Sequence, residues 1–170
     1  RSGHSFPTRR SSDLEDLETY RKSLTSKLEA KAKVKLPTKH GKFDMYGFTS
    51  QTNEEELVAI VSGDIKKTEN VRIHSSCLTG DIFHSQRCDC GEQLEASMKY
   101  ISEHGGIILY LPQEGRGIGL INKLKAYELI EQGYDTVTAN IALGFDEDLR
   151  DYKDAARILK YFGIESVNLL

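Results

Sequence analysis

The stretch that decides the fold class is GIILYLPQEGRGIGLINKLKAYELIEQGY, residues 106–134. Its first six residues form an apolar run between glycine and proline, which is typical of a buried strand. PQEGRGIG follows as a glycine-rich loop, and apolar residues then recur at helical spacing, which predicts an amphipathic helix. The aligned residues of this helix are Leu120, Leu124, Tyr127 and Ile130. A strand, a loop and a helix in succession indicate a fold that packs strands and helices in layers.

The segments on either side continue this pattern. Alternating or continuous apolar residues predict strands at 43–49, 57–63 and 71–75, so the globular part opens with three or four strands. Helices are predicted at 93–106 and 150–164, a mixed segment at 136–145, and a last strand at 166–170. We therefore predict an α/β or α+β fold, with a mixed β-sheet flanked by helices in a single domain with an N-terminal arm.

The two ends of the chain differ from the middle. Residues 1–14 are rich in Ser and Arg and have almost no apolar pattern, so we expect a non-native or disordered tail. Residues 15–33 place leucines near helical spacing among many charges, which indicates a linker or a helical arm. Pro37 and Gly41 interrupt the chain there, and the domain is expected to span 34–170. Because the final strand stops within an apolar run, we expect a domain truncated at its C-terminus.

Charge and composition exclude several classes of protein. Residues 1–33 carry eight Lys or Arg against five Asp or Glu, whereas the remainder carries fifteen against twenty-one. A domain with a net charge of −6 has no overall field that attracts nucleic acid, so local groups must bind any anion. No apolar run approaches the ~20 residues that span a bilayer, and no signal peptide is recognisable. We expect a cytoplasmic protein that binds neither nucleic acid nor membrane.

All three cysteines lie in HSSCLTGDIFHSQRCDCGEQ, residues 74–93. An odd number of clustered thiols excludes a closed disulfide framework and favours a reducing compartment. Cys77, Cys88 and Cys90 are soft ligands suited to zinc, although three small buried thiols are the alternative. The fourth ligand of such a zinc is either a histidine, His74 or His84, or a water molecule, which would make the site catalytic.

Two further segments carry polar residues of chemical interest. In the glycine-rich loop, backbone N–H groups and Arg116 are suited to a phosphate, although a solvated turn is the alternative. In LGFDEDLRDY, residues 143–152, Asp148 is a candidate base and Arg150 a candidate phosphate contact. Acidic residues at the start of a solvated helix are the alternative there. Tyr127 lies on the predicted apolar face, where core packing is the default.

Three motifs together resemble GTP cyclohydrolase II, the family that catalyses the first committed step of riboflavin synthesis. They are VRIHSSCLTGDIFHSQRCDCGEQLEA at 71–96, YLPQEGRGIGLINKLKAYELIEQGYDT at 110–136, and AN..LGF..D.RDY at 139–152. The resemblance runs from about residue 35 to residue 170. It implies zinc-dependent hydrolysis of GTP to formate, pyrophosphate and a diaminopyrimidine ribosyl phosphate, with Mg²⁺ at the pyrophosphate, in a homodimer.

The resemblance also implies roles for individual residues. The zinc ligands are Cys77, Cys88 and Cys90. The GTP-binding residues are Arg72, Ile73, His74, Ser75, Ser76, Gln93, Glu114, Gly115, Arg116 and Thr136. Asp148 matches the proton acceptor, Arg150 the nucleophile toward the α-phosphate, and Tyr127 a tyrosine of the ring-opening chemistry. Physical chemistry favours Arg150 as an electrostatic clamp instead, because a guanidinium stays protonated.

The chain departs from the family pattern in two places. The family commonly has Glu where this chain has Ser76, and it continues past the last strand with a Thr-Asn-Asn-Pro stretch and a nucleotide-binding lysine. The arm resembles the junction after a dihydroxybutanone-phosphate synthase domain in bifunctional relatives, so we expect such a fusion in the native chain. The alternatives are a zinc-stabilised non-catalytic nucleotide-binding module and an enzyme that stops at the formamide product.

Overall fold

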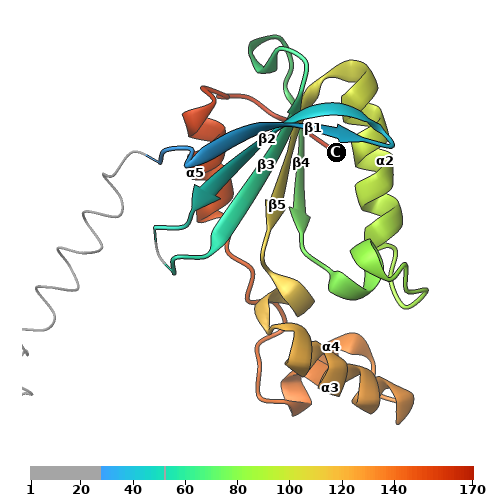
Figure 1. The fold of residues 1–170 in the computed structure, drawn as a ribbon. Helices are drawn as coiled ribbons and strands as arrows, with labels where there is room; N and C mark the ends of the chain where they lie inside the picture. Colours follow the sequence, from blue (N-terminus) through green and yellow to red (C-terminus); the bar gives the residue numbers. More distant parts are fainter. Residues whose placement is uncertain (1–27, 52) are drawn as a thin grey trace, which may run out of the picture.

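A six-stranded mixed sheet forms the centre of the computed structural model, which describes residues 28–51 and 53–170 (Figure 1). Its strands are β1 (Ala32–Thr38), β2 (Gly41–Thr49), β3 (Glu56–Ser62), β4 (Asn70–Ser75), β5 (Gly106–Leu111) and β6 (Asn168–Leu169). They lie in the order β1-β2-β3-β5-β4-β6. The first three strands and β5 pair antiparallel, whereas β4 pairs parallel with both β5 and β6. This arrangement confirms the predicted mixed sheet.

One helix covers each face of the sheet (Figure 1). On one face α2 (Cys90–His104) buries Ile101 against Phe43, Ile60 and Ile108. On the other face α5 (Lys153–Tyr161) buries Ala155 and Ile158 in a larger cluster. The central strand β5 contributes to both clusters, which explains why its sequence is a continuous apolar run rather than an alternating one.

Two helices lie apart from the sheet, beyond the end of β5 (Figure 1). These are α3 (Leu120–Glu131) and α4 (Thr136–Ala142), which pack against each other. The predicted helix at 120–134 is therefore present, but its inward face differs from the predicted one. Lys123 and Ala126 are buried, whereas Leu124 is 42% exposed. The reason is that α3 packs against the loops of a polar cavity and not against the sheet.

Several boundaries also differ from the sequence-based expectations. The sequence predicted three or four strands at the start of the domain, and β1 is the fourth, whose position was not predicted. Pro37 lies within β1, which is possible because an edge strand tolerates a missing N–H donor. Ala32 already pairs with Gly47, so this strand begins before the expected domain start at residue 34. The tail at 1–14 and the arm up to residue 27 lie outside the described residues. The mixed segment is helical in α4, where Asp135 forms a capping box with Thr138.

Three short helical turns complete the described chain: η1 (Ile65–Lys67), η2 (Leu78–Ile82) and η3 (Glu114–Gly117). The last two follow directly after β4 and β5 and carry residues of the cavity described below. Within residues 28–51 and 53–170, no helix has the length and hydrophobicity that a membrane span requires.

Ile101 should be one of the residues that anchor α2, and with it Cys90, to the sheet. Its side chain is fully buried, so Ile101→Ala should leave a cavity and lower the free energy of unfolding by about 2–5 kcal/mol. Chemical denaturation monitored by circular dichroism measures this change. Lys99→Ala on the exposed side of the same helix is the control, and we expect it to change stability by less than about 0.5 kcal/mol. Equal effects of the two substitutions would contradict this packing.

Candidate active site

A cavity of about 580 Å³ opens where the parallel strands β4 and β5 end. Ligand sites in α/β proteins commonly lie outside the carboxyl ends of such strands. The walls come from the end of β4, the start of α2, the glycine-rich loop, α3 and the segment after α4. Every residue that the sequence marked as a candidate lines this cavity except Asp148 and His84. These are Arg72, Ile73, His74, Ser75, Ser76, Cys77, Cys88, Cys90, Gln93, Glu114, Gly115, Arg116, Tyr127, Thr136 and Arg150.

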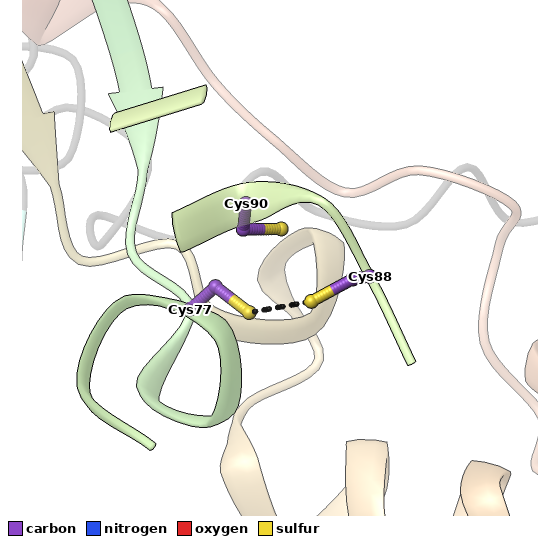
Figure 2. A group of neighbouring side chains, drawn as sticks. All are labelled: Cys77, Cys88 and Cys90. Carbon is purple, nitrogen blue, oxygen red and sulfur yellow. Dashed lines mark hydrogen bonds between the residues drawn. The ribbon is translucent and has the colours of Figure 1, made fainter. Parts of the chain in front are cut away.

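The three thiols converge in one wall of this cavity (Figure 2). Cys77 follows β4, Cys88 precedes α2, and Cys90 is the first residue of α2, so the helix begins earlier than the sequence predicted. All three Sγ atoms lie within 4.8 Å of one another, and the Cys77 and Cys88 atoms are 3.6 Å apart. Tetrahedral zinc with bonds of about 2.3 Å separates its sulfur ligands by about 3.8 Å, so the donor set fits zinc.

Gly80 makes this close approach possible. A Cβ atom at this position would lie 2.9 Å from Cys88 Sγ and 3.2 Å from Cys77 Sγ. Its backbone N–H also donates to Cys77 Sγ, at 3.4 Å. A side chain here would displace the thiols, so the turn after Cys77 requires glycine at this position to bring them together.

Neither histidine that was considered as a fourth ligand belongs to this group of ligand atoms within the described chain. His74 is buried, and its Nε2 lies 3.1 Å from Asp81 Oδ1. Three protein ligands without a fourth are the donor set of a catalytic zinc rather than a structural one.

The surroundings shift the pKa values of Cys77 and Cys90 in opposite directions. Burial raises the pKa of Cys77, but hydrogen bonds from Lys123, Thr79 and the Gly80 amide outweigh it, so the pKa is lowered overall. Burial and the two neighbouring sulfur atoms raise the pKa of Cys90. The surroundings of Cys77 therefore favour its thiolate, which is the form that binds metal.

Lys123 is a site residue that the sequence analysis did not single out. Its Nζ lies 3.0 Å from Cys77 Sγ, 2.9 Å from Thr79 Oγ1 and 2.7 Å from Glu114 Oε1. Burial lowers the pKa of Lys123, but the hydrogen bonds to Cys77 and Glu114 raise the pKa by more than burial lowers it. The ammonium therefore stays charged. Lys123 precedes Tyr127 by one helical turn, and this spacing could have placed Lys123 on the same face as Tyr127.

A second buried network holds the start of the thiol loop. The Asp81 carboxylate accepts hydrogen bonds from the backbone N–H of Cys77 at 2.9 Å and from the Tyr110 hydroxyl at 2.8 Å. His74 stacks on Tyr110 with ring centroids 5.6 Å apart. Burial raises the pKa of Asp81, but His74, the Cys77 amide and Tyr110 lower it below its usual value. The carboxylate therefore stays ionised and fixes the backbone of a thiol ligand.

Asp81→Asn should destabilise the protein by about 1.5–3 kcal/mol near neutral pH, because hydrogen bonds to a charged group are lost. A lowered pKa in the folded state contributes stability above the pKa of an unfolded aspartate, about 3.9, and this contribution disappears as the pH falls further. The variant should therefore lose less stability than the wild type upon acidification. Denaturation curves measured without zinc, from neutral pH to below about pH 3.9, test this expectation. Glu69→Gln, an exposed neutralisation, is the control, and parallel curves for wild type and Asp81→Asn would contradict the role.

The glycine-rich loop supplies backbone strain and positive charge to another part of the cavity wall. Gly115 and Arg116 both have a φ of 62°, which is rare for a residue with a side chain. Such strain clusters at functional sites, where surrounding structure enforces it. The backbone N–H of Leu149 donates to the Arg116 carbonyl at 3.0 Å, and this contact holds the segment after α4 against the loop.

Cations dominate the lining of the cavity although the chain as a whole is acidic. The cationic residues are Arg72, Arg87, Arg116, Lys123 and Arg150, and the carboxylates are Asp89 and Glu114. The Arg87 guanidinium lies 4.9 Å from the Tyr127 ring centroid and also pairs with Glu131. The Arg72 guanidinium donates to the Gln93 side chain and to the Leu170 carbonyl, and its buried Nε has no partner among the described residues. This local excess of positive charge suits an anionic ligand.

Asp148 lies at the margin of the cavity and pairs with Arg150. Arg150 Nε donates to both carboxylate oxygens, at 2.9 and 3.1 Å, and a guanidinium nitrogen adds a third contact. The guanidinium lowers the pKa of Asp148 to about 2, and the carboxylate raises the pKa of Arg150 in turn. Asp148 therefore orients Arg150 in this structure and is a weak base while the pair is intact.

Comparison of the sequence with family models places the chain in a known class of protein. The family model of GTP cyclohydrolase II matches residues 29–170, and the chain belongs to this family. It is 81% identical over 157 residues to riboflavin biosynthesis protein RibBA of Staphylococcus saprophyticus and 71% identical to that of Staphylococcus aureus. These matches cover 92% of this chain and 40% of each relative, so the chain spans less than half the length of the curated relatives that it matches.

One solved structure shares a looser similarity. It is a crystal structure of RibBX, a two-domain 3,4-dihydroxy-2-butanone 4-phosphate synthase from A. baumannii. The TM-score is 0.49 at 20% identity, over 95% of this chain and 44% of the other.

Proposed function

We propose that this chain carries the catalytic site for zinc-dependent hydrolysis of GTP to formate, pyrophosphate and a diaminopyrimidine ribosyl phosphate. The observation that carries the proposal is one cavity that is lined both by three convergent thiols and by four arginines. The thiols would hold zinc, and the arginines would receive a triphosphate. Membership of the GTP cyclohydrolase II family and the similarity to riboflavin biosynthesis proteins support the same reaction.

The cavity offers separate groups for the base and for the phosphates of GTP. Gln93 carries an amide that pairs with Arg72 and is suited to the edge of the guanine. The remaining GTP-binding candidates are Ile73, His74, Ser75, Ser76, Glu114, Gly115 and Thr136, which line the cavity around it. Of these, His74, Ser75 and Glu114 already have protein partners through their side chains. Arg116 and Arg150 would face the triphosphate, whose remaining charge Mg²⁺ would offset.

Zinc held by Cys77, Cys88 and Cys90 would supply a Lewis acid that activates water for attack at the guanine ring. The residues of the chain have the other tasks. Water attacks the α-phosphorus as its bond to pyrophosphate breaks, and Arg150 stabilises the charge at the α-phosphate. Tyr127, whose hydroxyl lies 3.5 Å from Thr79 Oγ1, moves a proton during ring opening. Asp148 accepts a proton only after Arg150 turns toward the phosphate, because their pairing lowers its pKa.

The setting of this site in the cell is part of the proposal. The reaction would be the first step of riboflavin synthesis, in a cytoplasmic protein fused to a dihydroxybutanone-phosphate synthase domain. The length of the RibBA relatives is consistent with such a fusion. A homodimer is supported by exposed apolar residues on α3 and α4, among them Ile121 and Ile141. Light scattering at micromolar concentration tests the dimer, and a purely monomeric chain would contradict it.

Formate release from GTP is the decisive test. The zinc-loaded chain with Mg²⁺, and the full-length protein that contains it, are assayed under single-turnover conditions. Release of both formate and pyrophosphate would support the proposal. A formylated pyrimidine without free formate would indicate an enzyme that stops at the formamide. Zinc binding without any turnover in the full-length protein would indicate a non-catalytic nucleotide-binding module.

A further inference from the structure

Lys123 is buried beside the thiol cluster, and all its hydrogen-bonding capacity is used within the protein. The residue is 9% exposed, and its ammonium contacts three acceptors: Cys77 Sγ, Thr79 Oγ1 and Glu114 Oε1. A lysine ammonium has three N–H donors and no more. Lys123 is therefore not free to bind a phosphate as Arg116 is, although both line the same cavity.

The position of Lys123 relative to the thiols is specific. It contacts the Sγ atom of Cys77, the most buried of the three thiols, and no contact with Cys88 or Cys90 is present in the described structure. Three thiolates and one dication leave a net charge of −1 in a partly buried wall, where uncompensated charge is costly. A cation 3.0 Å from one of these sulfur atoms offsets this charge without occupying a coordination position.

The same ammonium connects two segments that approach the cavity from different strands. Glu114 accepts from Lys123 through Oε1, and its other oxygen accepts from the backbone N–H of Leu78 at 2.6 Å. Leu78 follows Cys77 directly, so Lys123 and Glu114 close a ring of contacts between the thiol loop, the glycine-rich loop and α3. Gly115 allows the glycine-rich loop to approach Lys123 closely, since a Cβ at this position would lie 3.0 Å from Lys123 Cβ.

We propose that Lys123 is a positioning residue of the metal centre, which holds Cys77 Sγ in place and compensates the charge of the three-thiolate site. This role rests on the proposed zinc site. Residues that hydrogen-bond to metal ligands commonly change metal affinity by about 10–100-fold when they are replaced. Lys123→Met, which removes the charge and all donors at similar length, should weaken zinc binding by about that factor. Lys123→Arg should retain most of the affinity.

Metal binding is measured on the whole chain, without turnover. Zinc affinity is determined by competition with a chromophoric chelator, and Co²⁺ replaces zinc for absorption spectroscopy. An ammonium next to a thiolate stabilises the sulfur lone pairs, so its removal should shift the sulfur-to-cobalt charge-transfer band to longer wavelength. Lys125→Met, an exposed lysine two residues along the same helix, is the matched control and should leave affinity and spectrum unchanged.

The outcomes separate this role from a merely structural one. If Lys123→Met does not fold, Lys123→Gln, which keeps a donor without the charge, provides the same comparison. Wild-type affinity with an unshifted cobalt band in the folded variant would overturn the proposal. Lower affinity with an unshifted band would also overturn it, because that result describes general loosening of the site. A wild-type chain that binds no metal would overturn the zinc site itself, and the role of Lys123 with it.

Discussion

Replacement of Cys88 by serine should abolish formate release from GTP while pyrophosphate release continues. Cys88 Sγ lies 3.6 Å from Cys77 Sγ, and its loss leaves two thiols for the metal. A metal ion contributes several kcal/mol of charge stabilisation to hydrolysis, and each 1.36 kcal/mol is a factor of ten. We therefore expect formate release to fall by about 10³-fold or more. The arginines that would bind the triphosphate are unchanged in this variant.

The two products are measured separately in the full-length protein, together with zinc content and a circular dichroism spectrum. His84→Ala is the matched control, because His84 was a candidate fourth ligand but does not belong to the group of ligand atoms. This variant should keep its zinc and its formate release. Loss of both products in a folded Cys88→Ser chain would contradict the separate roles of zinc and the arginines. Loss of zinc in His84→Ala would instead favour a closed, structural metal site.

The sequence predicted the elements of the fold better than their contacts. The β5 segment was recognisable because a central strand buried on both faces has a continuous apolar sequence. The inward face of α3 was not recognisable from the sequence, because helical periodicity assigns the apolar side of a helix to the core. In the structure Lys123 is buried and Leu124 of the predicted face is 42% exposed, since α3 borders a polar cavity. Helical periodicity alone does not distinguish a helix on a core from a helix on a binding site.

The candidate site likewise contains residues that the sequence predicted and residues that it did not. The thiols were visible in the sequence because their spacing and residue type are unusual, whereas Asp81 and Lys123 are common residues in unremarkable positions. Their importance comes from contacts between segments, such as Asp81 with Tyr110 and Lys123 with Glu114. The pairing of Asp148 with Arg150 was also not predicted, although only two positions separate them. Both residues were given separate roles, and the structure shows that they share one ion pair.

Arg150 provides the second large effect, because its chemical role is testable by substitution. The carboxylate of Asp148 raises the pKa of Arg150, so the guanidinium remains protonated and has no lone pair with which to attack phosphorus. An arginine that stabilises charge in phosphoryl transfer commonly contributes about 10³–10⁵-fold to the rate. Arg150→Met should therefore lower pyrophosphate release by about 10³-fold or more. Arg150→Lys should retain a measurable part of it, because the positive charge remains.

The alternative, in which Arg150 is the nucleophile, makes opposite predictions for the same variants. It requires a covalent bond between a guanidinium nitrogen and the α-phosphate, so a guanylylated Arg150 should be detectable by mass spectrometry after rapid acid quenching. It also predicts that Arg150→Lys lacks this adduct and releases no pyrophosphate by that route. Asp148→Asn tests the ion pair itself. Without the carboxylate the guanidinium loses its orientation, so a clamp should release pyrophosphate more slowly and without an adduct. We expect the slower reaction, no adduct and partial activity in Arg150→Lys, because an ion pair that keeps Arg150 charged suits a clamp and opposes a nucleophile.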